Sequence, residues 1–325
     1  MKKRIFSGMR PTGKLHLGHL VGALHNWVNL QDEYHCIFGI VDWHALMGEY
    51  EQSKDIKENI LDMAIDWLAC GIDPKKSIVF VQSHVSEHLE LQMILACITP
   101  LGWLERNPIY KEQLREIKTR DLQTFAFLGY PVLQAADILL YKATAVPIGE
   151  DQLPHIELTR EIARRFNHIY KTDTFSDCKA ILTETPRLLG LDGRKMSKSY
   201  NNAINLSDSK GVIIKKVKQM FTDPKRIKLS DPGHPGKCNV CSYYKVFAPE
   251  MVDDVTQWCK KAQKGCTECK MILAEKLLVK LAPIQKKREA LVKNKKKVLD
   301  ILEDGRKRAK KIAEQTLAEV KKAVF

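Results

Sequence analysis

The first 82 residues contain three short apolar runs: Arg4-Ile5-Phe6-Ser7, Cys36-Ile37-Phe38-Gly39-Ile40-Val41 and Ser77-Ile78-Val79-Phe80-Val81-Gln82. Between them lie longer stretches, at about residues 17–31 and 64–68, in which apolar side chains recur with helical spacing. Strand, helix, strand, helix, strand in this order predicts an α/β fold with a doubly wound parallel sheet. Such sheets bind ligands at the carboxyl ends of their strands, so motifs that directly follow a strand are candidate site residues.

The remainder of the chain is predicted to be mainly helical. Residues 153–166 have the spacing of a long helix, whereas residues 145–148, Ala-Val-Pro-Ile, predict one further strand. Past residue 206 no strand pattern follows, and the sequence Ser-Asp-Pro-Gly-His-Pro-Gly at 230–236 interrupts the helical pattern. We therefore predict two domains, an α/β domain over residues 1–205 and an all-helical domain over residues 206–325.

The composition is that of a folded globular protein, with 44% hydrophobic and 28% charged residues. The basic N-terminus lacks the apolar core of a signal peptide, and no run is long enough to span a membrane. We therefore expect a cytoplasmic protein without a membrane contact, in which the nine cysteines stay reduced.

The net charge of +14 is concentrated near the C-terminus, where residues 270–325 hold 17 Lys and Arg against 7 Asp and Glu. Basic side chains on one surface favour a polyanionic partner such as nucleic acid, because Lys and Arg neutralise phosphates. A solvated helical face without such a partner is the alternative. The charge pattern alone leaves both open.

A glycine-containing motif follows the first predicted strand and opens the first predicted helix: Arg10-Pro11-Thr12-Gly13-Lys14-Leu15-His16-Leu17-Gly18-His19. A helix N-terminus favours negative charge, and a glycine turn lets the backbone approach a ligand. His16 and His19 lie three residues apart and can face one ligand, with Gly18 leaving space for it. The motif favours ATP phosphate binding; two surface histidines that flank a glycine are the alternative.

A second motif, Asp192-Gly193-Arg194-Lys195-Met196-Ser197-Lys198-Ser199, lies near the end of the predicted α/β domain. Its two lysines and two serines follow an Asp-Gly pair that is typical of a loop. Such a cationic loop can stabilise the charge that develops on pyrophosphate during nucleotidyl transfer. A solvated basic linker is the alternative, which the presence of the first motif disfavours.

The two motifs together resemble a known pair of signatures. His16-Leu17-Gly18-His19 and Lys195-Met196-Ser197-Lys198-Ser199 are similar to the HIGH and KMSKS sequences of class I aminoacyl-tRNA synthetases. The resemblance implies a Rossmann-type catalytic domain, ATP with Mg²⁺, and attack by an amino-acid carboxylate on the α-phosphate. It assigns catalytic roles in positioning and charge stabilisation to His16, His19, Lys195 and Lys198.

The amino-acid specificity is indicated by residues 129–141, 146–152 and 155–161. These segments resemble bacterial tryptophanyl-tRNA synthetases almost letter for letter, and the likeness is strong from Phe6 to about Leu206. The resemblance implies L-tryptophan and tRNA(Trp) as substrates, a homodimer, and a helical domain that binds the tRNA and its anticodon.

Asp137 is the candidate acceptor for the indole ring. An indole offers one donor, its ring N–H, so a selective pocket needs one buried acceptor among apolar walls. Asp137 lies within an apolar run, where a carboxylate is costly to bury without a partner. A helix cap or a structural ion pair is the alternative for Asp137, as core packing is for Phe6 and Tyr130.

The resemblance assigns two sets of binding residues. For tryptophan, Asp137 accepts from the indole, Phe6 and His44 line the ring, Tyr130 and Gln152 hold the α-ammonium, and Gln134 replaces a pocket Met of some relatives. For ATP, the matching positions are Arg10, Pro11, Thr12, Gly18, His19, Gly149, Glu150, Asp151, Leu188 and Lys195-Met196-Ser197-Lys198-Ser199. Some members carry Gln at the position of Arg10, so the partner of Arg10 stays open.

Five of the nine cysteines lie within residues 238–269. Two C-x-x-C pairs, Cys238/Cys241 and Cys266/Cys269, indicate a zinc site by their spacing. A subset of bacterial tryptophanyl-tRNA synthetases instead carries a [4Fe-4S] cluster, and Cys238, Cys259, Cys266 and Cys269 resemble its ligands. The first gap is shorter here than in that subset, and Cys241 is an extra thiol. We expect the cluster, with zinc as the alternative.

Three other functions stay open at this point. A tyrosyl-tRNA synthetase shares the fold and both signatures, and a small-molecule adenylyltransferase shares the first. A non-catalytic RNA-binding or iron–sulfur regulatory relative would lack a signature histidine or lysine. Ala135-Ala136-Asp137 and the intact second signature favour tryptophan activation followed by charging of tRNA(Trp).

Overall fold

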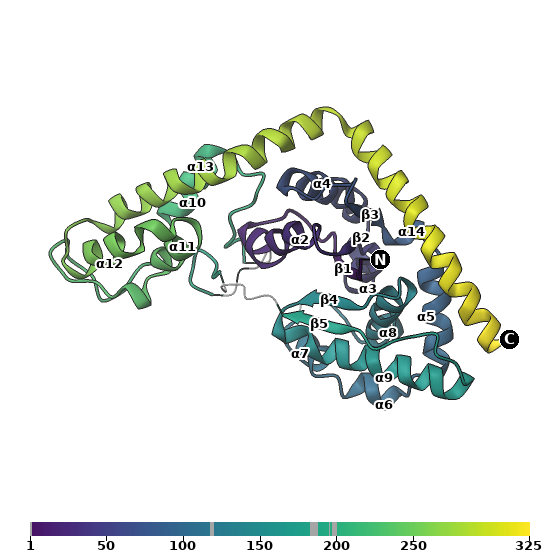
Figure 1. Ribbon diagram of the computed structural model, residues 1–325. Coiled ribbons are helices and arrows are strands. Elements are labelled where there is room, and N and C mark those ends of the chain that lie inside the picture. Colours follow the sequence, from purple (N-terminus) through teal and green to yellow (C-terminus); the bar gives the residue numbers. More distant parts are fainter. Residues whose placement is uncertain (1, 118–119, 183–187, 195, 197–199) are drawn as a thin grey trace. The chain divides into compact units, whose positions relative to one another are not determined.

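The computed structural model describes residues 2–117, 120–182, 188–194, 196 and 200–325. In this part of the chain five parallel strands form one sheet in the order β3-β2-β1-β4-β5 (Figure 1). They are β1 (Arg4–Met9), β2 (His35–Ile40), β3 (Ser77–Val81), β4 (Ala145–Ile148) and β5 (Lys179–Leu182). This order is that of a Rossmann-type sheet, so the predicted α/β fold is confirmed.

The strand order reverses between β1 and β4, which pair through Ile5 and Ala145. Ligands of such sheets bind outside the carboxyl ends of the strands at this reversal, and the predicted site segments after Met9 and Ile148 begin there. β5 was not expected from the sequence, because Lys179–Leu182 is short and its outer residues are exposed at the sheet edge. A strand of that kind lacks the continuous apolar run by which β1, β2 and β3 are recognised.

The chain divides into two compact units. The sheet unit comprises Met1–Gly13, Asn26–Glu184 and Asn294–Phe325, and the helical unit comprises Lys14–His25 and Thr185–Lys293. Helices of the sheet unit are α3 (Asp42–Glu49), α4 (Lys54–Cys70), α5 (Glu87–Ile98), α6 (Leu101–Glu105), α7 (Pro108–Glu116), α8 (Phe125–Leu140), α9 (Leu153–Tyr170) and α14 (Lys295–Val324). Those of the helical unit include α10 (Lys210–Lys218), α11 (Asn239–Phe247), α12 (Val252–Lys260) and α13 (Cys266–Lys293).

The helix expected over residues 17–31 is a continuous helical run with a local irregularity. It consists of α1 (Leu17–His19), the π-helical segment η1 (Leu20–Leu24) and α2 (His25–Leu30). A π-helical turn widens the helix and is frequent beside functional sites. Here it directly follows the first signature motif.

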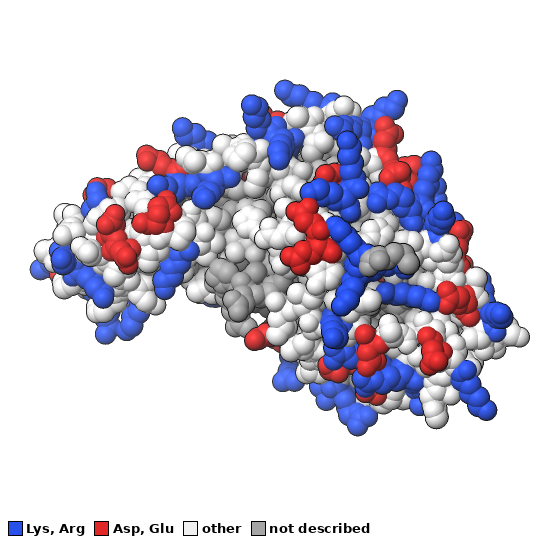
Figure 2. Space-filling model, in the orientation of Figure 1, with Lys and Arg blue, Asp and Glu red and all other residues white. Residues whose placement is uncertain are grey.

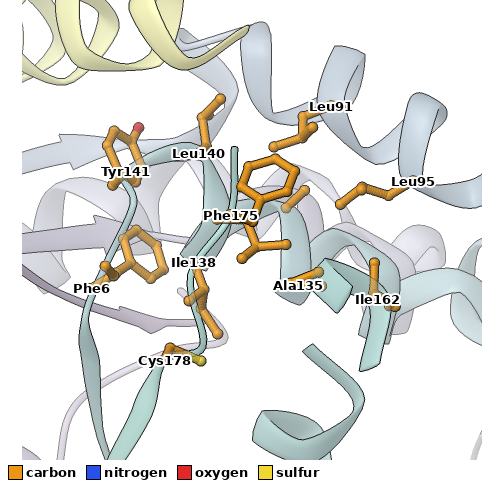
Figure 3. Close-up of a cluster of buried hydrophobic side chains, with 14 of the residues drawn as sticks. Phe6, Leu91, Leu95, Ala135, Ile138, Leu140, Tyr141, Ile162, Phe175 and Cys178 are labelled. Carbon is orange, nitrogen blue, oxygen red and sulfur yellow. The ribbon is translucent and has the colours of Figure 1, made fainter. Parts of the chain in front are cut away.

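The core of the sheet unit is built around α8, which is apolar on nearly all its faces and is therefore buried. The side chain of Thr124 caps this helix by accepting from the backbone N–H of Phe127 at 3.2 Å. Figure 3 shows side chains of β1, α5, α8 and α9 in contact, including Phe6, Leu91, Leu95, Ala135, Ile138, Tyr141 and Ile162. The core therefore holds α8, with its single acidic residue, between the sheet and α5.

Helix α14 packs on the edge strand β3, although it follows the helical unit in sequence. A Cβ atom at Gly305 would lie 1.8 Å from the carbonyl oxygen of Val79, so only glycine permits this approach. Arg308 also donates to the carbonyl oxygens of Pro74 and Ser77, at 2.8 and 3.3 Å. The two compact units therefore do not correspond to one boundary at residue 205, because residues 294–325, which include α14, belong to the sheet unit.

The helical unit has its own core, in which α13 packs against α10 and α11. Leu273 and Leu277 of α13 are buried with Ile213 of α10 and Tyr243 of α11. The backbone N–H of Leu17 donates to the carbonyl oxygen of Ile204 at 3.0 Å, which ties the first signature to this unit. No helix of the described residues is long and apolar enough to cross a membrane.

Candidate active site

Asp137 lies in the last turn of α8 and is 2% exposed. Among the described residues, three side chains contact its carboxylate. Gln82 and His88 contact Oδ1 at 2.7 and 2.6 Å, and His44 contacts Oδ2 at 2.9 Å. The three partners come from different parts of the chain: His44 lies in α3, Gln82 directly follows β3, and His88 lies in α5. The sheet topology therefore assembles the group.

The charge of Asp137 follows from these contacts. Burial alone would raise the pKa of the carboxyl, but His88 and His44 outweigh it and hold the pKa at about 2. Asp137 is therefore ionised at neutral pH and can only accept hydrogen bonds. Asp137 is thus a buried acceptor to which a ring N–H can donate.

Three further predicted tryptophan-site residues lie close to Asp137 in sequence or space. Tyr130, Gln134 and Asp137 are spaced by four and three residues on α8, so they share one face of the helix. Gln134 is half-buried on this face. Phe6 of β1 is 4% exposed and stacks on Tyr141, with ring centroids 5.5 Å apart. The fold thus brings Phe6, His44, Tyr130, Gln134 and Asp137 into one region of the sheet unit.

Tyr130 is held by a buried histidine. Its hydroxyl lies 3.2 Å from Nε2 of His155 on α9, and Asn107 lies 3.3 Å from Nδ1 of the same ring. Desolvation lowers the pKa of His155 to about 4, so the ring is neutral at pH 7. Gln152 is half-buried in the turn before α9 and donates to Asp151 at 3.0 Å. Tyr130 is thus placed through α9, and Gln152 precedes that helix directly.

The predicted ATP-site residues of the sheet unit follow β1 and β4. Arg10 is solvent-accessible, Pro11 is buried and Thr12 is half-buried at the end of β1. A Cβ at Gly48 would lie 3.9 Å from Nη1 of Arg10, so the Arg10 side chain reaches α3. After β4, a Cβ at Gly149 would meet Asp151 Oδ1 at 2.6 Å, and Glu150 is exposed. Both segments lie at carboxyl ends, as predicted.

The first signature lies in the helical unit, where His16 caps α1. Its Nδ1 accepts from the N–H of Gly18 at 3.1 Å, and the N–H of His16 donates to Nδ1 of His19 at 3.2 Å. The two rings are 3.8 Å apart between centroids. A Cβ at Gly18 would lie 2.9 Å from the His16 ring and 3.3 Å from Met196 Sδ. Glycine therefore keeps the signature histidines together and Met196 of the second signature beside them.

The second signature begins in an ordered turn. Gly193 has a φ of +82°, and Asp192 accepts from the backbone N–H of Arg194 at 3.0 Å and from Asn202 at 2.8 Å. Burial would raise the pKa of Asp192, but the bonds from Asn202 and Arg194 hold it at about 2. Leu188 is half-buried before this turn. Lys195, Ser197, Lys198 and Ser199 lie outside the described residues.

All five clustered cysteines line one small cavity of about 20 Å³ in the helical unit. Cys238 directly precedes α11. A hydrogen bond with the thiol of Cys241 is the main cause that lowers the pKa of Cys238 to about 6. A Cβ at Gly233 would lie 2.6 Å from Cys259 Sγ, so the predicted breaker segment approaches this cavity closely. Even so, no group of three or more His, Cys, Asp or Glu side chains in the described part of the chain is arranged to hold a metal. The cysteines share a cavity but not a ligand geometry.

A larger hollow of about 720 Å³ lies at the amino ends of the strands, opposite the carboxyl ends at which the candidate site residues lie. Its basic lining comprises Lys2, Lys3, Arg4, Lys76 and Lys142, and Figure 2 shows Lys and Arg gathered around this end of the chain. Because parallel sheets bind ligands at the carboxyl ends of their strands, this hollow is not the candidate active site.

Sequence reasoning missed three residues around Asp137: Gln82, His88 and Tyr141. They lie 55, 49 and 4 residues from Asp137 along the chain. Gln82 and His88 belong to other elements, and no local spacing pairs them with α8. The first turn of α5, Glu87-His88-Leu89-Glu90, is mostly polar, so the sequence held no signal that singled out His88.

Comparison with known proteins identifies the class of the chain. Residues 1–282 match the family described as tRNA synthetases class I (W and Y), and the chain belongs to this family. Within the family, its relatives are tryptophan–tRNA ligases. It is 48% identical over 326 residues to that of Thermotoga maritima, covering 99% of this chain and 98% of the relative. It is 44% identical over 392 residues to that of Aquifex aeolicus, covering 99% of both.

A solved structure gives the same answer. The tryptophanyl-tRNA synthetase of Campylobacter jejuni, crystallised with ADP and tryptophan, superposes with a TM-score of 0.90 and 32% sequence identity. The match covers 99% of each chain. The class I synthetase fold and the helical C-terminal region predicted from the sequence are therefore confirmed.

Proposed function

We propose that this chain is a tryptophan–tRNA ligase. It joins L-tryptophan to the α-phosphate of ATP with release of pyrophosphate, and then transfers tryptophan to the 3′-terminal adenosine of tRNA(Trp). Full-length similarity to tryptophan–tRNA ligases at 44 and 48% identity supports this assignment. The observation that carries it is Asp137, an ionised, buried acceptor on the last turn of α8, in the region that also holds Phe6 and His44.

The chemistry we propose needs no nucleophilic side chain. The tryptophan carboxylate attacks the α-phosphorus, and the bond to the bridging oxygen breaks so that pyrophosphate leaves. His16 and His19 contact the ATP phosphates, and Lys195 and Lys198 stabilise the charge on the departing pyrophosphate. Mg²⁺, when bound with ATP, neutralises phosphate charge.

We propose the binding residues as two sets. Tryptophan contacts Phe6, His44, Tyr130, Gln134, Asp137 and Gln152. ATP contacts Arg10, Pro11, Thr12, Gly18, His19, Gly149, Glu150, Asp151, Leu188 and residues 195–199. The first set is supported by the shared face of Tyr130, Gln134 and Asp137 on α8. The second set is supported by residues 10–12 and 149–151, which directly follow the carboxyl ends of β1 and β4.

One assay tests the function. Exchange of pyrophosphate into ATP is measured with each amino acid separately, followed by charging of unfractionated tRNA. We expect exchange with tryptophan alone and charging of tRNA(Trp). Exchange that depends on tyrosine would support the tyrosyl alternative, and exchange without any charging would support a small-molecule adenylyltransferase. No exchange with any amino acid would indicate a non-catalytic relative.

We further propose that Cys238, Cys259, Cys266 and Cys269 bind a metal group, a [4Fe-4S] cluster in preference to zinc. Their shared cavity and the soft thiolate donors support it, since thiolates suit both groups. Its role would be structural, because it links α11, α12 and α13. After anaerobic purification we expect brown protein that contains iron and sulfide. Colourless protein with stoichiometric zinc would contradict the cluster, and metal-free folded protein would contradict both.

We also propose that the enzyme is cytoplasmic, forms a homodimer, and binds tRNA(Trp) through its basic C-terminal helices. The concentration of Lys and Arg in residues 270–325 supports the tRNA contact. Sedimentation of the purified enzyme with and without tRNA tests both the dimer and the complex.

A further inference from the structure

We propose that His88 and Tyr141 are positioning residues that orient the Asp137 carboxylate, so that Oδ2 accepts the indole N–H. The proposal rests on the tryptophan activation argued above and deepens it. His88 and Tyr141 are both fully buried. His88 lies between the other two groups, 2.6 Å from Asp137 Oδ1 and 2.8 Å from the Tyr141 hydroxyl.

The direction of these hydrogen bonds follows from the charge of Asp137. An ionised carboxylate only accepts, so Nδ1 of His88 must carry a hydrogen and donate it. In a neutral imidazole the other nitrogen is then an acceptor, and the Tyr141 hydroxyl donates to it. Burial and the charge of Asp137 raise the pKa of Tyr141 well above its ordinary value, so this hydroxyl keeps its proton. Tyr141 thereby fixes the tautomer of His88.

A count of acceptor positions identifies the oxygen that is left for the substrate. A carboxylate has about four lone-pair positions, two on each oxygen. Gln82 and His88 both bond to Oδ1, and His44 bonds to Oδ2. The position that remains is on Oδ2, beside His44, whose side chain is 10% exposed whereas that of His88 is 0% exposed. The indole therefore reaches Asp137 from the side of His44.

Tyr141 also supports the apolar wall of the predicted pocket. Its ring stacks on Phe6 with an interplanar angle of 8°, and Figure 3 shows these two rings at one end of the core cluster. Phe80 packs against the edge of Tyr141, with centroids 5.7 Å apart. One buried tyrosine thus places both the ring wall, through Phe6, and the acceptor, through His88.

The test uses His88→Asn and His88→Gln as a matched pair. The amide nitrogen of Asn can occupy the place of Nδ1 and donate to Asp137, whereas that of Gln lies near Nε2 and faces Tyr141. Pyrophosphate exchange is measured with tryptophan and with β-(benzothiophen-3-yl)alanine, whose sulfur replaces the ring N–H. The ratio of the two kcat/KM values reports recognition of that N–H. We expect H88N to keep this ratio within about threefold of wild type and H88Q to lower it about tenfold, through the KM for tryptophan.

Leu95→Ala is the control for stability, because Leu95 is buried on the same helix as His88. It should lower Tm and leave the ratio unchanged. Tyr141→Phe, which keeps the ring on Phe6, should lower the ratio about threefold and remains informative where a His88 variant does not fold. Equal ratios in both His88 variants, or an unchanged ratio in Y141F, would overturn the positioning role. Wild-type enzyme without tryptophan-dependent exchange would instead refute the proposed function.

Discussion

A buried carboxylate stays ionised only where hydrogen-bond donors replace the water it has lost. Asp137 meets this condition through Gln82, His88 and His44. Two of these contacts, with His44 and His88, are also the kind of structural pair that was the alternative considered for Asp137 from the sequence. The two interpretations are compatible, because these contacts leave one acceptor position for a ligand.

We predict that Asp137→Asn lowers kcat/KM for tryptophan about a hundredfold or more. The NH₂ group of Asn would face side chains that themselves donate, so some buried donors around residue 137 would lose their acceptor. Gln134→Met, one turn earlier on α8, should change kcat/KM only about threefold, since it retains the volume and removes no charge. Pyrophosphate-exchange kinetics of both variants provide the comparison. Effects of equal size would mean that Asp137 has a structural role only.

His155 predicts a dependence of stability on pH. Its pKa is about 4 in the folded protein, against 6.5 for an unperturbed histidine. Between pH 6.5 and 4, His155 therefore binds a proton in the unfolded chain but not in the folded protein. The free energy of unfolding consequently falls as the pH decreases from 6.5 to 4. The full effect is about 3 kcal/mol, and His155→Gln should remove it. Urea unfolding at pH 7 and pH 5 measures this slope; identical slopes in both proteins would contradict the prediction.

At this scale, the sequence could identify the charged and aromatic residues of the site but not the groups that orient them. Asp137 was identifiable because a carboxylate in an apolar run needs a partner. His88 and Gln82 were not, since they reach Asp137 only after β3 and α5 pack against α8. Contacts of that kind depend on the assembled sheet and leave no mark in the local spacing.

Among the elements, α14 is held against β3 by a backbone contact at Gly305. We predict that Gly305→Val destabilises the protein by about 3 kcal/mol or more, because the added carbons overlap the Val79 carbonyl and force the helix away. Gly211→Ala is the matched control. This helical glycine has open space around its Cβ position, so alanine should be neutral or stabilise by up to about 1 kcal/mol. Tm should therefore fall for Gly305→Val and stay the same or rise for Gly211→Ala.

The elements themselves were predicted unequally. β1 to β4 and α9 were readable, because continuous apolar runs and helical spacing are strong local signals. The short edge strand β5 was missed, and the return of α14 to the sheet could not be read, because an amphipathic pattern shows that a face is buried but not against what. A glycine at residue 305 in a long helix was the local sign of a close contact.

For the whole molecule, the basic C-terminal stretch serves two purposes. Lys310 pairs with Glu87 at 3.0 Å and Lys321 with Glu90 at 2.7 Å, so these lysines attach α14 to α5. Lys295, Lys296 and Lys297 at the start of α14 are exposed. The positive charge therefore divides into lysines that hold the fold and lysines that face solvent.

We predict that replacing Lys295, Lys296 and Lys297 together by Ala raises the KM for tRNA(Trp) about tenfold near physiological salt. The dependence of that KM on salt should also weaken, because fewer phosphate contacts release fewer counterions. Tryptophan-dependent pyrophosphate exchange should stay unchanged, since it needs no tRNA. Aminoacylation across a range of salt concentrations provides the measurement, and an unchanged KM would place the tRNA contact elsewhere.

The contact between α14 and β3 has a consequence for synthesis of the chain. On the ribosome, β3 emerges more than 200 residues before α14, so a nascent chain presents the edge of β3 uncovered for most of its translation. Bare strand edges pair readily with other chains. The Rossmann-type unit can therefore cover the edge of β3 only after residues 294–325 have left the exit tunnel, and until then this edge is open to pairing with other chains.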